Sequence, residues 1–67
     1  IAYNNRGAAY HDLGQYQRAI EDYADAIRLN PQDADAYHYR GLANEALGNT
    51  SAADRDFKKA IELGYTP

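Results

Sequence analysis

Hydrophobic residues recur along this chain with the period of an amphipathic helix. Between residues 17 and 29 they fall at Ala19, Ile20, Tyr23, Ala26 and Ile27. These positions lie three and four residues apart and therefore share one helical face. No segment alternates hydrophobic and polar residues with the period of two that a half-buried strand shows. The pattern predicts an all-α chain.

Glycine, proline and capping residues mark where the helices begin and end. The predicted helices cover about residues 2–13, 17–29, 34–47 and 51–63. Gly14, Gly48 and Gly64 can take the left-handed conformation that ends helices. Pro31 ends the second helix, because it disfavours helical geometry in the residue before it. Asp33 is expected to cap the third helix, and Asn49 or Thr50 the fourth.

The residues repeat at an offset of 34 positions. Twelve of the 33 pairs aligned by this offset are identical, and Tyr23 is replaced by Phe57, which keeps the ring. The identical pairs are Ala2/Ala36, Tyr3/Tyr37, Arg6/Arg40, Gly7/Gly41, Ala9/Ala43, Leu13/Leu47, Gly14/Gly48, Ala19/Ala53, Asp22/Asp56, Ala26/Ala60, Ile27/Ile61 and Leu29/Leu63. A fixed period of about 20–50 residues indicates stacked helical units. We expect one module over residues 1–67, with repeat 1 at about 1–33 and repeat 2 at about 34–67.

The repeated residues follow a recognisable order. Repeat 1 has Tyr3-x2-Arg6-Gly7-x2-Tyr10, then Ala19-x3-Tyr23, then Pro31. Repeat 2 has Tyr37-x2-Arg40-Gly41-x2-Asn44, then Ala53-x3-Phe57, and it has Tyr65 in place of the proline. This order resembles the tetratricopeptide repeat (TPR), whose 34-residue pattern is W-x2-L-G-x2-Y, A-x3-F and P. The resemblance implies two helix–turn–helix hairpins, four antiparallel helices in all, forming a short right-handed α-solenoid fragment.

Small residues and arginines have separate expected roles in each repeat. We expect Gly7 to lie where two helices cross closely, with aromatic rings filling the space beside it. Arg6 and Arg40 stand where the TPR pattern has leucine, and Asp22 and Asp56 follow each of them at the same spacing. We predict Arg6–Asp22 and Arg40–Asp56 ion pairs that join the two helices of each repeat. A pair of ligand-binding arginines is the alternative.

TPR-like stacks hold a peptide or an extended partner segment on a concave face lined by the first helix of each repeat. The resemblance places Ile1, Asn4, Asn5, Ala8, His11 and Asp12 of repeat 1, and Asp35, His38, Tyr39, Leu42, Glu45 and Ala46 of repeat 2, on that face. Asn4, Asn5 and Tyr39 are expected to contact the peptide backbone. The alternative is that these side chains are only solvated helix surface.

The predicted groove does not resemble the carboxylate clamp of some TPR modules. Such clamps have Lys and Asn where this chain has Asn4 and Ala8. The acidic residues Asp12, Asp35 and Glu45 instead favour a neutral or basic ligand.

Composition narrows the class of partner. The chain carries 7 Lys and Arg, 10 Asp and Glu, and a net charge of −3. This argues against nucleic acid or an anionic membrane, since both attract basic proteins. No apolar run approaches the roughly 20 residues of a membrane span, and no segment resembles a signal peptide. We expect a soluble module, and the sequence does not indicate its compartment.

The sequence holds no recognisable catalytic or metal constellation. Cys and Met are absent, and Ser51 is the only serine and lies at a predicted helix start. His11 and His38 are expected about two helical turns apart, roughly 10 Å, which is too far to share a metal ion. We therefore predict neither an enzyme nor a bound cofactor.

The sequence is compatible with two functions. The leading one is a protein–protein interaction scaffold that binds a protein or peptide. The other is a structural unit that stacks on copies of itself through its exposed terminal helices, because about three repeats are usually needed for stability. The last helix keeps Ala53, Phe57, Ala60 and Ile61 in the pattern of an internal repeat. We expect a fragment of a longer array, or an excised or designed unit.

Overall fold

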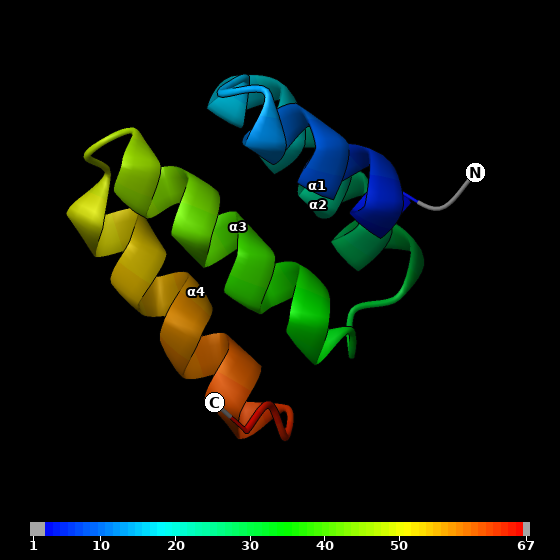
Figure 1. Cartoon of the computed structure of the whole chain (residues 1–67). Coiled ribbons are helices and arrows are strands. Elements are labelled where there is room, and N and C mark those ends of the chain that lie inside the picture. The colour runs from blue at the N-terminus through cyan, green and yellow to red at the C-terminus, as the bar shows by residue number, and fades with distance from the viewer. Residues whose placement is uncertain (1–2, 67) are drawn as a thin grey trace.

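The computed structural model describes residues 3–66 as two helical hairpins. The helices are α1 (Tyr3–Asp12), α2 (Tyr16–Leu29), α3 (Ala34–Ala46) and α4 (Thr50–Glu62). Figure 1 shows α1 lying along α2 and α3 lying along α4, with α3 placed between the first hairpin and the last helix. Residues 3–66 contain no strand. The all-α prediction of two helix–turn–helix hairpins is confirmed.

The helix ends follow the local signals in the sequence. Gly14 and Gly48 have φ angles of +77° and +81°, a left-handed conformation that glycine adopts without strain. Asp33 caps α3 by accepting a hydrogen bond from the Ala36 backbone N–H at 3.1 Å. Asn49 precedes α4, but its side chain makes no capping bond. Ala2, the predicted first helical residue, lies outside the described residues.

In each hairpin, an aromatic ring of the second helix packs against a glycine of the first helix. A Cβ atom placed on Gly7 would lie 2.7 Å from Tyr23 Cε1, and one on Gly41 would lie 2.7 Å from Phe57 Cε1. Real Cβ atoms do not approach other carbons so closely, because interiors are packed at van der Waals distance. The helices of each hairpin therefore cross where one of them lacks a side chain, as the sequence predicts for Gly7.

The hydrophobic core lies across the boundary between the two repeats. Ala19 and Tyr23 of α2 are buried together with Ala43 of α3. The partly buried side chains of Tyr10, Tyr16 and Ile20 pack around this cluster. The small Ala43 allows α3 to approach the rings closely, so the second hairpin stacks directly on the first.

Candidate functional site

A hollow opens between the first helices of the two hairpins. Its volume is about 160 Å³. It is lined by Ala8, His11 and Asp12 of α1, Tyr39 and Leu42 of α3, and Tyr23 of α2. Five of these residues were predicted groove positions. Tyr23 was assigned only to the core, although its hydroxyl, which Phe57 lacks, is a polar group that the core does not require.

Tyr23 joins the core to this hollow. Its side chain is only 1% exposed, and its ring stacks on Tyr39 with 5.9 Å between the centroids. Burial raises the pKa of Tyr23 to about 12, with smaller contributions from Tyr39, Asp12 and Asp22. Asp12 and Tyr23 both line this hollow. The hollow thus combines aromatic walls with one exposed carboxylate.

A second hollow lies between α3 and α4. It has a volume of about 290 Å³ and is lined by His38, Leu42, Phe57, Ile61 and Tyr65. The Tyr65 ring stacks on His38 with centroids 4.1 Å apart, so the residue in place of the expected proline covers one end of this hollow. Leu42 lines both hollows, which makes them neighbours along α3.

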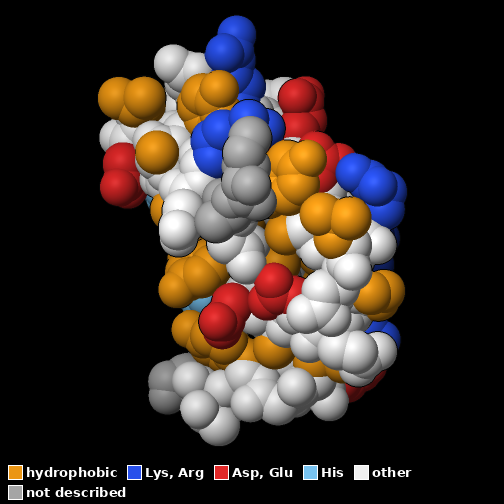
Figure 2. Space-filling view, turned by 90° about the vertical axis from the view of Figure 1, so that its right-hand side faces the viewer, with side chains coloured by type: hydrophobic (Ala, Val, Ile, Leu, Met, Phe, Trp, Pro, Cys, Tyr) orange, Lys and Arg blue, Asp and Glu red, His pale blue; other side chains and the backbone are white. Residues whose placement is uncertain are grey.

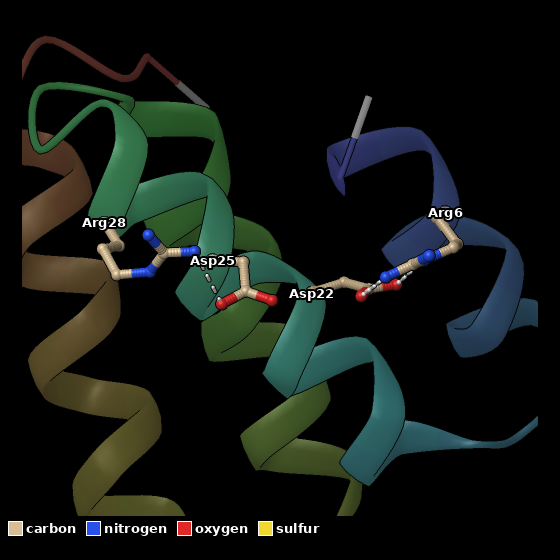
Figure 3. A network of polar contacts seen from close by, with 4 residues as sticks. All are labelled: Arg6, Asp22, Asp25 and Arg28. Carbon is tan, nitrogen blue, oxygen red and sulfur yellow. Dashed lines mark hydrogen bonds and ion pairs between the residues drawn. The ribbon is translucent and has the colours of Figure 1, made fainter. Parts of the chain in front are cut away.

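Within each hairpin, an ion pair joins the first helix to the second. Arg6 Nε and Nη2 donate to the Asp22 carboxylate at 2.9 and 2.8 Å, and Arg40 donates to Asp56 at 3.0 and 2.8 Å. These are two-pronged contacts, the strong geometry for arginine and carboxylate. The carboxylate hydrogen bonds raise the pKa of both arginines. Figure 3 shows Arg6 reaching across to Asp22, which leaves its guanidinium engaged within the chain.

The two pairs differ in their surroundings. Asn44 Nδ2 donates a third hydrogen bond to Asp56 at 3.0 Å. The corresponding position of repeat 1 is Tyr10, which makes no such bond within residues 3–66. The side chain of Arg40 is 26% exposed and that of Arg6 is 45% exposed. The second pair is therefore better shielded from water.

Comparison with known proteins agrees with this architecture. A family model described as "TPR repeat" matches residues 7–48, and one described as "Tetratricopeptide repeat" matches residues 34–63. The chain belongs to the tetratricopeptide repeat family. TPR units form protein-interaction scaffolds, so the module is of the protein-interaction type.

Several curated relatives align over nearly all of this TPR module. Heat shock protein STI1 of Saccharomyces cerevisiae is 33% identical over 63 residues, covering 94% of this chain and 11% of that protein. Translocon at the outer membrane of chloroplasts 64 of Pisum sativum is 44% identical over 64 residues, covering 96% and 11%. DnaJ homolog subfamily C member 7 of Homo sapiens is 33% identical over 63 residues, covering 94% and 13%. The chain spans about a tenth of the length of these relatives.

The remaining groove positions of the TPR module are not all available to a ligand. Asn4 Nδ2 donates to Asp33 Oδ2 at 2.8 Å, and Asn4 Oδ1 is buried without a partner within residues 3–66. The donor of this amide is thus used inside the chain, which differs from its predicted contact with a peptide. Asn5 and Glu45 are exposed and line neither hollow. Ile1 lies outside the described residues.

The described residues contain neither a cluster of metal ligands nor a membrane-spanning helix. Within the described part of the chain, no three His, Cys, Asp or Glu side chains are grouped closely enough to hold a metal ion. None of the helices of residues 3–66 has the length and apolar character needed to cross a membrane. His11 instead makes an edge contact with Tyr16, at 5.0 Å between centroids.

Proposed function

We propose that this TPR module binds a peptide or extended segment of a partner protein along α3, and that it does not act as an enzyme. The observation that carries the proposal is that Leu42 lines both hollows. Two adjacent hollows offer places for two side chains of one extended segment. Concave sites lined by apolar and aromatic groups with few polar ones are typical of ligand binding.

The groove is held in place before any ligand arrives. The Asn4–Asp33 hydrogen bond joins α1 to the start of α3. The Arg6–Asp22 and Arg40–Asp56 pairs join each first helix to the second helix of its hairpin. A rigid site loses less conformational entropy on binding, which favours affinity.

Charge supports a protein partner over nucleic acid or an anionic membrane. The residues lining the two hollows include Asp12 but no Lys or Arg. On the face shown in Figure 2, basic side chains are separated by acidic, hydrophobic and other groups, without one continuous basic surface. Nucleic-acid binding requires a clustered basic footprint.

A random peptide library displayed on phage tests the proposal. We expect the 67-residue chain to select peptides, and Leu42→Ser or Tyr39→Ala to weaken binding of a selected peptide. The matched control is Leu29→Ser, because Leu29 is also a leucine, is 63% exposed and lines neither hollow. Failure to select any peptide, or equal binding by Leu42→Ser and the original chain, contradicts the proposal.

Self-association is a second candidate, supported by the apolar surface of α4. Ile61 is 61% exposed beside the second hollow. A second copy would cover it by placing its α1 on α4, as α3 lies on α2. However, Thr50 and Asp54 occupy the positions that correspond to Tyr16 and Ile20, which pack around the buried cluster in repeat 1. The same contact on α4 would therefore bury polar groups, which is unfavourable.

Sedimentation across a concentration series tests this second candidate. If copies stack through α4, the apparent mass rises with concentration, and Ile61→Glu abolishes the rise. Leu29→Glu serves as the control for an added surface charge. A constant monomer mass up to high micromolar concentration excludes stacking.

A further inference from the structure

The hollow between α1 and α3 carries an uncompensated negative charge. Asp12 is exposed at its edge and makes no ion pair with any residue of the described part of the chain. Arg6 and Arg40, the nearest arginines along the first helices, are already paired with Asp22 and Asp56. A cation that enters the hollow therefore meets a free carboxylate.

The floor of the same hollow holds a second polar group, the hydroxyl of Tyr23. The Tyr23 side chain is almost wholly buried, lines the hollow, and makes no hydrogen bond with its hydroxyl inside residues 3–66. A tyrosine hydroxyl can accept a hydrogen bond as well as donate one. Within residues 3–66 the enclosed side-chain atom that lacks a partner is Asn4 Oδ1, so the Tyr23 hydroxyl is open to the hollow and can accept a hydrogen bond from a ligand.

Aromatic and apolar walls complete the environment. Tyr39 lies over Tyr23, and Ala8 and Leu42 face the same space. Aromatic rings attract ammonium and guanidinium groups through their quadrupole. The methylene groups of a lysine or arginine pack well on apolar side chains, while the charged end reaches a polar partner.

The two hollows differ in the residues that matter for this chemistry. At an offset of 34, Asp12 corresponds to Ala46 and Tyr23 to Phe57. Phe57 lines the second hollow without a hydroxyl, no carboxylate lines that hollow, and Phe57, Leu42 and Ile61 form its apolar lining. Because Phe57 packs against Gly41 as Tyr23 packs against Gly7, the Tyr23 hydroxyl is not required by the helix crossing.

We infer that the hollow between α1 and α3 holds a lysine or arginine side chain of the partner peptide, with the Asp12 carboxylate as its counter-ion and the Tyr23 hydroxyl as an acceptor. The neighbouring hollow beyond Leu42 then takes an apolar side chain of the same peptide. The inference rests on the proposed function and names the peptide class: a basic residue close to an apolar one.

The test compares library selections by three proteins. The original chain is expected to enrich peptides with Lys or Arg at one fixed position near an apolar residue. Asp12→Asn is expected to lose that enrichment while still selecting apolar residues. Asp54→Asn is the matched control, since it removes one exposed carboxylate of α4 outside both hollows. Asp12→Asn should fold normally, because a negative charge in the last turn of a helix is unfavourable to the helix dipole.

The binding affinity of one selected peptide is then measured for the original chain and for Asp12→Asn. Replacing its basic residue with glutamine should weaken binding to the original chain about fivefold, the effect of a partly exposed ion pair. The same replacement should leave binding to Asp12→Asn nearly unchanged, which a double-mutant cycle detects. Selected peptides without a fixed basic residue, or equal enrichment by Asp12→Asn, overturn the inference but leave peptide binding intact. Selection of no peptide by the original chain overturns the proposed function itself.

Discussion

The ring of Tyr23 lies directly against Gly7, where a Cβ atom would come within 2.7 Å of Tyr23 Cε1. The Gly41–Phe57 contact has the same nearest distance, 2.7 Å. Two different rings thus meet glycine in the same geometry, and the hydroxyl that distinguishes them takes no part in the helix crossing. Both repeats keep the contact between the glycine and the ring. They differ in the group that the ring presents to the groove, which is a hydroxyl in Tyr23 and is absent in Phe57.

Gly7→Leu is expected to destabilise the chain by about 1–3 kcal/mol or more, because the new side chain would overlap the Tyr23 ring. The free energy of unfolding in urea, followed by circular dichroism, measures the effect. Ala8→Leu is the control: Ala8 is exposed and the equivalent residue of repeat 2 is Leu42. An unchanged unfolding curve for Gly7→Leu would contradict the close crossing.

Asp56→Ala should destabilise the chain more than Asp22→Ala. Removing the Asp56 carboxylate leaves the donors of half-buried Arg40 and buried Asn44 without this acceptor, which costs about 1–3 kcal/mol. Removing Asp22 frees only Arg6, which is more exposed and can be hydrated. Urea unfolding of both variants measures the order. Equal destabilisation would show that the third hydrogen bond, from Asn44, contributes little.

Asp33→Ala should cost about 1 kcal/mol through loss of the α3 cap, and more if the Asn4 contact also contributes. Asp33→Ser separates the two effects, because a serine hydroxyl can cap α3 but has no second oxygen for Asn4. We expect its stability to lie between those of the original chain and Asp33→Ala. If Asp33→Ser matches the original chain, the bond between α1 and the α3 cap is energetically unimportant.

Stability should fall in alkali because of Tyr23. Its pKa is raised from 10.0 to about 12 in the folded chain, mainly by burial. The unfolded chain therefore loses this proton first, and stability falls as the pH rises from about 10 through about 12. Urea midpoints measured over this range should fall less steeply for Tyr23→Phe, which keeps the ring, as Phe57 does in repeat 2. Identical slopes would show that Tyr23 titrates normally in the fold.

The helices and the paired charges follow from signals that are local or repeated. Gly14, Gly48 and Asp33 mark helix ends through their own backbone preferences, which act within a few residues. The Arg6–Asp22 spacing recurs as Arg40–Asp56, and a charge pair that returns with the repeat period indicates a contact inside each hairpin. These features were predictable because each hairpin contains all of the atoms involved.

The features that were missed join different hairpins or depend on three-dimensional shape. Asn4 of α1 bonds to Asp33, the residue that caps α3 of the second hairpin, and no periodic pattern connects these two residues. Asn44 strengthens the Asp56 contact at a position where the repeat departs from Tyr10. Tyr23 forms the floor of a hollow as well as part of the core, a double role that helical periodicity cannot distinguish.

The buried cluster of Ala19, Tyr23 and Ala43 draws its members from both repeats. Neither hairpin therefore has a complete hydrophobic core by itself. Separating the hairpins would expose the Tyr23 ring, which also packs against Gly7. In a stack of repeats, stability comes from neighbouring pairs as well as from single units. In this chain the buried cluster and the Asn4–Asp33 hydrogen bond both join the two hairpins. Melting of either hairpin should therefore destabilise the other. Loss of structure should be cooperative, and the groove along α3 should vanish in the same step.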